Sequence, residues 1–145
     1  MKNKTDVGRI ADLDAILKGS VSEYYVASVI AGYGYEIAIV HGIGFDLLAI
    51  CPETGKTYRI EVKGASKPAK TRNPKPRLQF HVKNITAKTT DIVAFHYMPT
   101  DDLIFVPACS IRDDQTTVAI EINSGFKKDP YQSWKECFEV LQESD

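Results

Sequence analysis

The sequence has few of the features that stabilise small secreted proteins or that place a chain in a membrane. Its three cysteines, Cys51, Cys109 and Cys137, are widely spaced and include no Cys-x-x-Cys pair, so we expect reduced, mostly buried thiols. No stretch approaches the roughly 18 apolar residues that a membrane span requires. The N-terminal lysines are not followed by the apolar run of a secretory signal. These absences predict a cytoplasmic protein that needs no disulfide.

Glycine and proline are not enriched either. Nine glycines, seven prolines and a hydrophobic fraction of 43% exclude collagen-like, low-complexity and disordered chains. The length of 145 residues fits one domain, since domains usually contain about 100–150 residues. We therefore expect a single domain over residues 1–145, large enough to bury a hydrophobic core.

A strong net charge is absent overall but present locally. The formal net charge is −1, yet the segment from Lys56 to Lys88 holds ten basic residues and one acidic residue, a net charge of +9, which leaves −10 for the rest of the chain. A basic stripe of this kind is typical of proteins that bind the phosphate backbone of a nucleic acid. The alternative is that the proline-rich stretch 67–76 is only a mobile, solvated loop.

Hydrophobic periodicity predicts an α/β protein. Ser20 and Glu23 have the spacing of a capping box, which predicts a helix over 21–31, after a shorter helical piece at 12–17 and a break at Gly19. Short runs rich in β-branched and aromatic residues predict strands. These runs lie at 35–40, 45–51, 57–63, 78–83, 91–97, 103–107 and 117–122, and a final helix is expected at 130–142.

The second and third predicted strands bring two carboxylates together. If residues 52–55 form a four-residue hairpin loop, Asp46 lies opposite Glu61. Directly opposed like charges destabilise a sheet unless a positive charge lies between them. Lys63 shares a strand face with Glu61 because side chains alternate, so either Lys63 or a divalent cation supplies that charge. Two carboxylates with open positions for water suit Mg²⁺, which takes its remaining ligands from phosphate oxygens.

This arrangement resembles a known signature. The tripeptides Gly44–Asp46 and Glu61–Lys63, after a helix that carries Glu23, are similar to the motif of the PD-(D/E)xK nuclease superfamily. The region 18–108 resembles small group I intron homing endonucleases most, and archaeal Holliday-junction resolvases more distantly. The resemblance implies a restriction-endonuclease-like α/β fold, with a mixed β-sheet flanked by helices.

The resemblance also implies a role for each site residue. Asp46 and Glu61 would bind Mg²⁺, with Mn²⁺ as a substitute, and the backbone carbonyl of Val62 would add a third protein ligand. Lys63 would assist the attacking water, and Glu23 would orient that water.

Simpler interpretations of the same residues stay open. Glu23 would only complete the capping box with Ser20. Asp46 would form a plain salt bridge with Lys63 and take no part in catalysis.

The chain also differs from the signature in places. Some superfamily members use a glutamine just after the lysine strand, and Gln79 is the candidate at that place, unless it is an ordinary strand residue. His81, on the same strand face, would contact phosphate or lie in solvent. Phe45 occupies the position of the proline that names the motif, and the segment 84–90 leaves little room for the second helix of the common core.

Together these observations predict a Mg²⁺-dependent endodeoxyribonuclease that acts as a homodimer or a higher symmetric oligomer, because cutting two strands with one site per chain usually needs two chains. DNA as the substrate follows only from the resemblance, since a basic groove neutralises either backbone. One alternative is a nucleic-acid-binding module that keeps the fold but does not cut. Another is a protein-interaction domain that uses the acidic C-terminal helix around Trp134. The side chains expected to bind the nucleic-acid backbone are Lys67, Lys70, Arg72, Lys75, Arg77 and Lys83.

Overall fold

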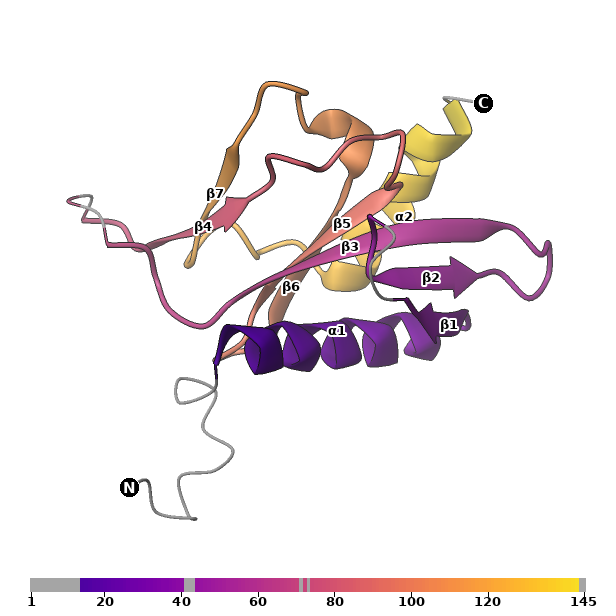
Figure 1. The fold of residues 1–145 in the computed structure, drawn as a ribbon, viewed down its shortest axis with the longest axis horizontal. Coiled ribbons are helices and arrows are strands. Elements are labelled where there is room, and N and C mark those ends of the chain that lie inside the picture. Colours follow the sequence, from indigo (N-terminus) through magenta and orange to yellow (C-terminus); the bar gives the residue numbers. More distant parts are fainter. Residues whose placement is uncertain (1–13, 41–43, 71, 73, 144–145) are drawn as a thin grey trace, which may run out of the picture.

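The computed structural model describes residues 14–40, 44–70, 72 and 74–143 (Figure 1). The elements in chain order are α1 (Ala15–Gly32), β1 (Glu36–Ile39), β2 (Leu47–Ile50), β3 (Thr57–Ala65), β4 (Arg77–His81), β5 (Ile92–Tyr97), β6 (Asp102–Pro107), the short 3-10 helix η3 (Ala108–Ser110), β7 (Thr117–Glu121) and α2 (Pro130–Glu143). All the predicted strands are present, with bounds that differ by no more than two residues at either end.

The strands form one mixed sheet and one smaller ribbon. The five-stranded sheet has the order β1-β2-β3-β5-β6, and β4 pairs with β7 in a separate two-stranded sheet. Within the larger sheet only β3 and β5 are parallel. The connection between them passes through β4 and a series of turns, and the described segment 84–90 contains no helix. The prediction of an α/β fold with a mixed sheet and no second core helix at this place is confirmed.

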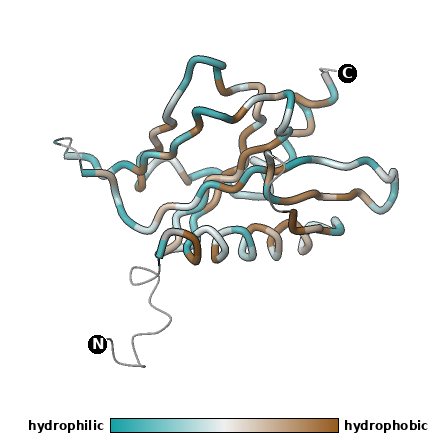
Figure 2. The backbone as a smooth tube through the Cα atoms, in the orientation of Figure 1, coloured by the Kyte–Doolittle hydropathy of each residue, from teal (hydrophilic) through white to brown (hydrophobic). Residues whose placement is uncertain are grey.

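The two faces of the sheet are covered by different elements. Ile60 and Val62 of β3 belong to a core that also includes Ile30 of α1 and Trp134 of α2. On the other face, residues of β5 such as Phe95 pack against the β4–β7 ribbon. Both helices therefore cover the same face of the sheet. Figure 2 shows hydrophobic residues along the central strands and hydrophilic residues along the arm between β3 and β4.

Helix α1 begins earlier than the sequence predicted. Asp14 caps it, because its side chain accepts a hydrogen bond of 2.9 Å from the backbone N–H of Leu17. The helix continues through Gly19, where a break was expected, so the cap and the packing outweigh the cost of about 1 kcal/mol for a helical glycine. Ser20 is then a mid-helix residue whose hydroxyl donates to the Ile16 carbonyl. The predicted capping box of Ser20 and Glu23 is wrong.

Helix α2 belongs to the core. Trp134 is 1% exposed and meets Phe105 and Phe138 edge to face, with ring centroids 5.0 and 4.9 Å apart. This side chain is therefore unavailable to a partner, and the alternative of a protein-interaction domain that uses the C-terminal helix would have to rely on the exposed residues of α2.

The structure corrects the expectation about the thiols. All three cysteines are free, but only Cys137 is buried, while Cys51 is half-buried and Cys109 is exposed. Burial raises the pKa of the Cys137 thiol to about 12, which makes it unreactive at neutral pH. No helix in the described part of the chain is both long and apolar enough to span a membrane.

Candidate active site

The pairing of β2 with β3 has the predicted register. Leu47 faces Ile60 as the last pair of this ladder, and Asp46, one residue earlier, lies beside the stretch of β3 from Ile60 to Val62. Two backbone hydrogen bonds extend the ladder to Asp46: its N–H donates to Ile60 at 2.9 Å, and its carbonyl accepts from Val40 at 2.8 Å. Asp46 therefore lies just before β2 and not inside the strand, as the sequence had indicated. Backbone contacts on both sides fix its position.

The side chain of Asp46 contacts the edge of β3. Its Oδ2 accepts a hydrogen bond of 2.8 Å from the backbone N–H of Val62. Pairing with β2 stops at Ile60, so this part of the edge has no β2 partner. The N–H and C=O of one strand residue point to the same side, which directs the Val62 carbonyl toward the Asp46 side as well. Two carboxylates and one carbonyl are thus brought to one edge.

The turn before Asp46 depends on glycine. Gly44 has a φ of +88°, a conformation that favours glycine. The buried Thr90 hydroxyl donates to the Gly44 carbonyl at 3.4 Å, which ties the turn to the segment before β5. The remainder of the glycine-rich approach, residues 41–43, lies outside the described residues.

Glu61 has the most perturbed environment in the cluster. Its side chain is 19% exposed, and Lys63 Nζ lies 3.8 Å from Glu61 Oε1. Burial, followed by the charge of Asp46, raises the pKa of Glu61 to about 7, although Lys63 opposes the shift. Lys63 therefore pairs with Glu61, which differs from the simpler alternative of a plain salt bridge between Asp46 and Lys63.

Glu23 approaches the same cluster from α1. The helix packs on the opposite face of the sheet, yet the charge of Glu23 is among the causes that raise the pKa of Glu61. Because Ser20 is not the N-cap residue, the capping-box interpretation of Glu23 does not apply.

The donor set fits a magnesium-like cation. Asp46 and Glu61 offer hard oxygen ligands, and their mutual repulsion is relieved either by a proton or by a cation. In the described part of the chain, no group of three or more His, Cys, Asp or Glu side chains is arranged to hold a metal ion. A metal at this edge would therefore complete its shell with the Val62 carbonyl, water and phosphate oxygens, which is the coordination that Mg²⁺ favours.

An exposed basic arm extends from β3 to β4. The arm begins after Ala65, returns at Arg77 and is closed by a hydrogen bond of 2.9 Å from Ala69 N–H to the Arg77 carbonyl. It projects away from the sheet (Figure 1). The side chains predicted to contact nucleic acid are all exposed; five belong to the arm or begin β4, and the sixth follows β4: Lys67, Lys70, Arg72, Lys75, Arg77 and Lys83.

One member of the basic segment does not belong to this surface. The guanidinium of Arg59 donates to both oxygens of Asp91, through Nε at 3.1 Å and Nη2 at 3.0 Å, and to the Lys88 carbonyl at 2.6 Å. Its charge is neutralised in a fork-shaped pair, which braces β3 against the entry to β5. The sequence gave no local signal for this pair, because its members are 32 residues apart.

Gln79 and His81 lie on the exposed face of β4, together with Arg77. No hydrogen bond or ion pair within residues 14–40, 44–70, 72 and 74–143 joins Gln79 to Asp46, Glu61 or Lys63. The catalytic role of Gln79 stays a prediction.

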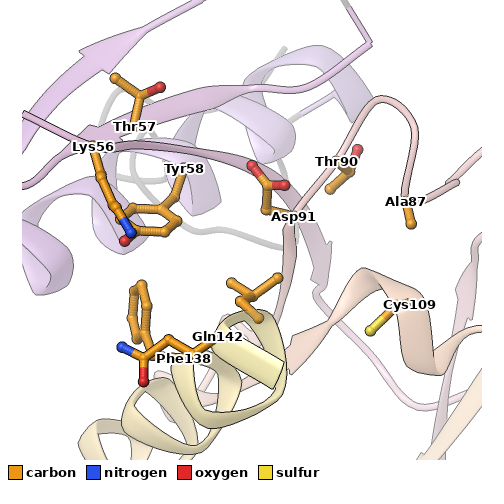
Figure 3. A pocket seen from close by; sticks show the side chains of 10 residues that line it. Lys56, Thr57, Tyr58, Ala87, Thr90, Asp91, Cys109, Phe138 and Gln142 are labelled. Atoms are coloured by element: carbon orange, nitrogen blue, oxygen red, sulfur yellow. The ribbon is translucent and has the colours of Figure 1, made fainter. Parts of the chain in front are cut away.

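The pocket drawn in Figure 3 is a different place. It has a volume of about 370 Å³ and is lined by residues from the start of β3, the turns before β5 and the end of α2, among them Tyr58, Asp91 and Phe138. None of the carboxylates at the β3 edge lines it. A phosphodiester site on an extended polymer needs carboxylates that can hold a cation beside the backbone, and those lie at the β3 edge.

The chain matches no protein-family model and no curated protein sequence. Its structure is similar to that of a bacterial homing endonuclease, with a TM-score of 0.63 and 12% identity over 91% of this chain and 95% of the other. It is also similar to Hjc, a Holliday junction resolvase from the archaeal hyperthermophile Archaeoglobus fulgidus, with a TM-score of 0.51 and 19% identity over 75% of this chain and 87% of the other. Both resemblances predicted from the sequence are therefore confirmed at the level of the fold, and this chain has the restriction-endonuclease-like fold of these two structures.

Proposed function

We propose that this protein is a Mg²⁺-dependent endonuclease that hydrolyses phosphodiester bonds of DNA. The observation that carries the proposal is the junction of Asp46 with Glu61 and Lys63 at an open strand edge. A partly buried carboxylate pair next to a lysine stores unfavourable electrostatic energy, which a divalent cation relieves. The adjacent basic arm supplies positive charge for a polyanion.

Each residue of the cluster has a task in this proposal. Asp46 and Glu61 hold the cation, with the Val62 carbonyl as a third protein ligand. Lys63 donates to the attacking water or to the charge that develops on the phosphate. Glu23 accepts a hydrogen bond from that water and so orients it. When bound, Mg²⁺ or Mn²⁺ would withdraw charge from the phosphate and make water a better nucleophile.

DNA is favoured over RNA by the similar folds. One is named as a homing endonuclease and the other as a Holliday junction resolvase. The exposed lysines and arginines of the arm would neutralise backbone phosphates without reading bases. Linear and branched DNA are therefore both appropriate substrates for a first assay.

The proposal is tested by cleavage of plasmid DNA and of a four-way junction in Mg²⁺ or Mn²⁺. The wild type is compared with Lys63→Ala, and Lys127→Ala, an exposed lysine outside the cluster, serves as the matched control. We expect nicking by the wild type and by Lys127→Ala and none by Lys63→Ala. Equal nicking by all three proteins would point to a contaminant or to another site.

The alternative is a nucleic-acid-binding module that does not cut. It predicts that the metal-free protein binds DNA with a steep salt dependence but has the same melting temperature with and without Mn²⁺. The nuclease proposal predicts instead that Mn²⁺ raises the melting temperature in a concentration-dependent way.

We also propose that the active form is a homodimer or a higher symmetric oligomer, because one site per chain cuts one strand at a time. Sedimentation velocity with and without a DNA duplex tests this. A monomer that makes double-strand breaks in single encounters would contradict it.

A further inference from the structure

A buried chain of polar side chains begins next to Glu23 in the sequence. Ser22 Oγ lies 2.8 Å from His96 Nδ1, and His96 Nε2 lies 2.8 Å from Asp101 Oδ1. Ser22 and His96 are each 0% exposed. The chain ties α1 to β5 and to the turn between β5 and β6.

The chemistry of the three groups sets the direction of the hydrogen bonds. Burial lowers the pKa of His96, although Asp101 opposes the shift, so the ring is neutral with a single N–H. The Asp101 carboxylate only accepts, so Nε2–H donates to it, and Nδ1 then accepts the proton of the Ser22 hydroxyl. Among the described residues no buried side-chain nitrogen or oxygen lacks a hydrogen-bond partner. The buried polar atoms of Ser22 and His96 therefore all have hydrogen-bond partners.

Close packing surrounds the chain. The Tyr25 ring stacks on His96 with ring centroids 4.5 Å apart, and its hydroxyl donates to the Asp101 backbone carbonyl at 3.3 Å. On β3, a Cβ added to Gly64 would collide with Ser22 Oγ. Helix α1 therefore approaches β3 so closely at Gly64 that only glycine fits there.

Asp101 is held in an uncommon backbone conformation. Its φ of +55° makes it the only described residue other than glycine with a positive φ. Such a conformation persists where the surroundings hold it in place, and here both the carboxylate and the carbonyl of Asp101 are bound, by His96 and by Tyr25. Strain of this kind is frequent near functional sites.

The three residue types are those of a serine hydrolase triad, but the geometry excludes that role. Ser22 has no exposed surface, so no substrate can reach its oxygen. The exposed end of the chain is Asp101, whose side chain is 56% exposed, whereas a nucleophilic triad needs its serine at the open end.

We propose that the Ser22–His96–Asp101 chain is a positioning device that holds Glu23 at the open edge of β3, beside the carboxylate pair. Ser22 precedes Glu23, and Gly64, against which Ser22 packs, follows Lys63. The contact between Ser22 and Gly64 thus joins the immediate neighbours of two site residues. This inference rests on the proposed nuclease function and makes Ser22, His96 and Asp101 positioning residues, which do not touch the substrate.

The test measures the single-turnover rate of DNA cleavage at saturating Mg²⁺, together with the DNA dissociation constant. Ser22→Ala removes the hydroxyl with little loss of volume, and Ile30→Val, a buried change elsewhere on α1, is the control for destabilisation. We expect Ser22→Ala to cut about tenfold more slowly with an unchanged dissociation constant, and Ile30→Val to cut like the wild type. The slowing should equal that of Glu23→Gln, and the double variant should be no slower than either single variant.

Asp101 offers a second pair of variants that should both fold. Asp101→Asn keeps an acceptor for His96 and tolerates a positive φ, whereas Asp101→Gly fits the backbone but loses the acceptor. We expect Asp101→Asn to cut like the wild type and Asp101→Gly to slow like Ser22→Ala.

Several results would overturn the inference. One is cleavage by Ser22→Ala or Asp101→Gly at the wild-type rate. Another is a Glu23→Gln variant that cuts at the wild-type rate. A third is a double variant whose slowing equals the product of the slowing by Ser22→Ala and the slowing by Glu23→Gln. If the wild type itself does not cut, the proposed function is wrong and the inference is overturned with it. If the wild type cuts and the variants cut equally fast, only the inference is wrong.

Discussion

The two halves of β3 have different neighbours and different tasks. From Thr57 to Ile60 the strand pairs with β2, and from Ile60 to Ala65 it pairs with β5. The first half completes the hairpin that sets the register. The second half has no β2 partner, and there the structure places Glu61 and Lys63. A single strand thus provides both the paired hairpin and the open edge, because pairing with β2 ends at Ile60 and pairing with β5, on the other side of β3, begins there.

The comparison also explains why charges are tolerated at this place. Residues of β3 that face the helices, such as Ile60 and Val62, are buried and apolar. Those on the other face, Glu61 and Lys63, are only partly buried, so water or a ligand can reach them. The alternation of side chains along β3 thus places the core residues on one face and the candidate site residues on the other.

The largest expected effect on stability comes from the second half of β3. Gly64→Ala would drive a Cβ into Ser22 Oγ and should lower the free energy of unfolding by about 3 kcal/mol. Gly55→Ala lies in open space with a φ of +73° and should cost about 1 kcal/mol. Urea denaturation of both variants measures the difference, and equal losses would contradict the close packing at Gly64.

The second effect is a pH dependence of stability. The pKa of Glu61 is raised from 4.5 to about 7, so between these pH values the folded protein keeps a proton that the unfolded chain has lost. The free energy of unfolding should therefore fall as pH rises from about 4.5 to 7 and then level off, by on the order of 3 kcal/mol. Glu61→Gln cannot ionise and should remove this fall.

Urea midpoints at pH 5 and pH 8 measure the pH effect, with Glu139→Gln, an exposed glutamate on α2, as the matched control. Mn²⁺ competes with the proton, so its stabilising effect should grow between pH 5 and pH 8. A Glu61→Gln protein with the wild-type pH dependence would contradict the assignment of the shift.

A smaller effect is expected from Arg59, in the first half of β3. Arg59→Lys loses the fork-shaped contact with Asp91 and should cost about 1–2 kcal/mol of stability. Because this guanidinium is already neutralised by Asp91, DNA affinity should be unchanged. Loss of affinity without loss of stability would show that Arg59 belongs to the nucleic-acid surface.

The smallest effects are expected from single residues of the basic arm. Lys67→Ala and Lys70→Ala remove exposed charges and should each reduce the slope of log affinity against log salt by about 0.9 if the lysine contacts a phosphate. The dissociation constant should change equally for unrelated DNA sequences. Filter binding at several salt concentrations measures the slope. Unchanged slopes would show that these lysines contact no phosphate and would favour the alternative of a solvated loop.

Local patterns predicted the frame of the site well. The length of the loop 52–55 and the alternation of side chains set the register of β2 with β3, and thereby predicted that Asp46 lies close to Glu61, whose pKa its charge raises. The start of α1 was predicted wrongly, because Gly19 and the Ser20–Glu23 spacing outweighed the true cap, Asp14. Local signals mislead where tertiary packing decides.

Contacts between distant segments had no signal in the sequence. Ser22 and His96 are 74 residues apart, and nothing near His96 marks it as a partner of α1. The pairing of Lys63 with Glu61 and not with Asp46 depends on side-chain conformations, which alternation along a strand does not specify. Periodicity predicted which strand residues share a face of the sheet. It did not predict that the two helices cover one face and the β4–β7 ribbon covers the other.

The measurement that tests the central claim most directly is calorimetric titration of the metal-free protein with Mn²⁺ at pH 8, for the wild type and Asp46→Asn. The account predicts binding to the wild type and an affinity at least tenfold weaker for Asp46→Asn, because this variant loses a charged ligand but keeps its shape. Equal affinities for the two proteins, or no binding to either, would contradict a metal site at the β3 edge.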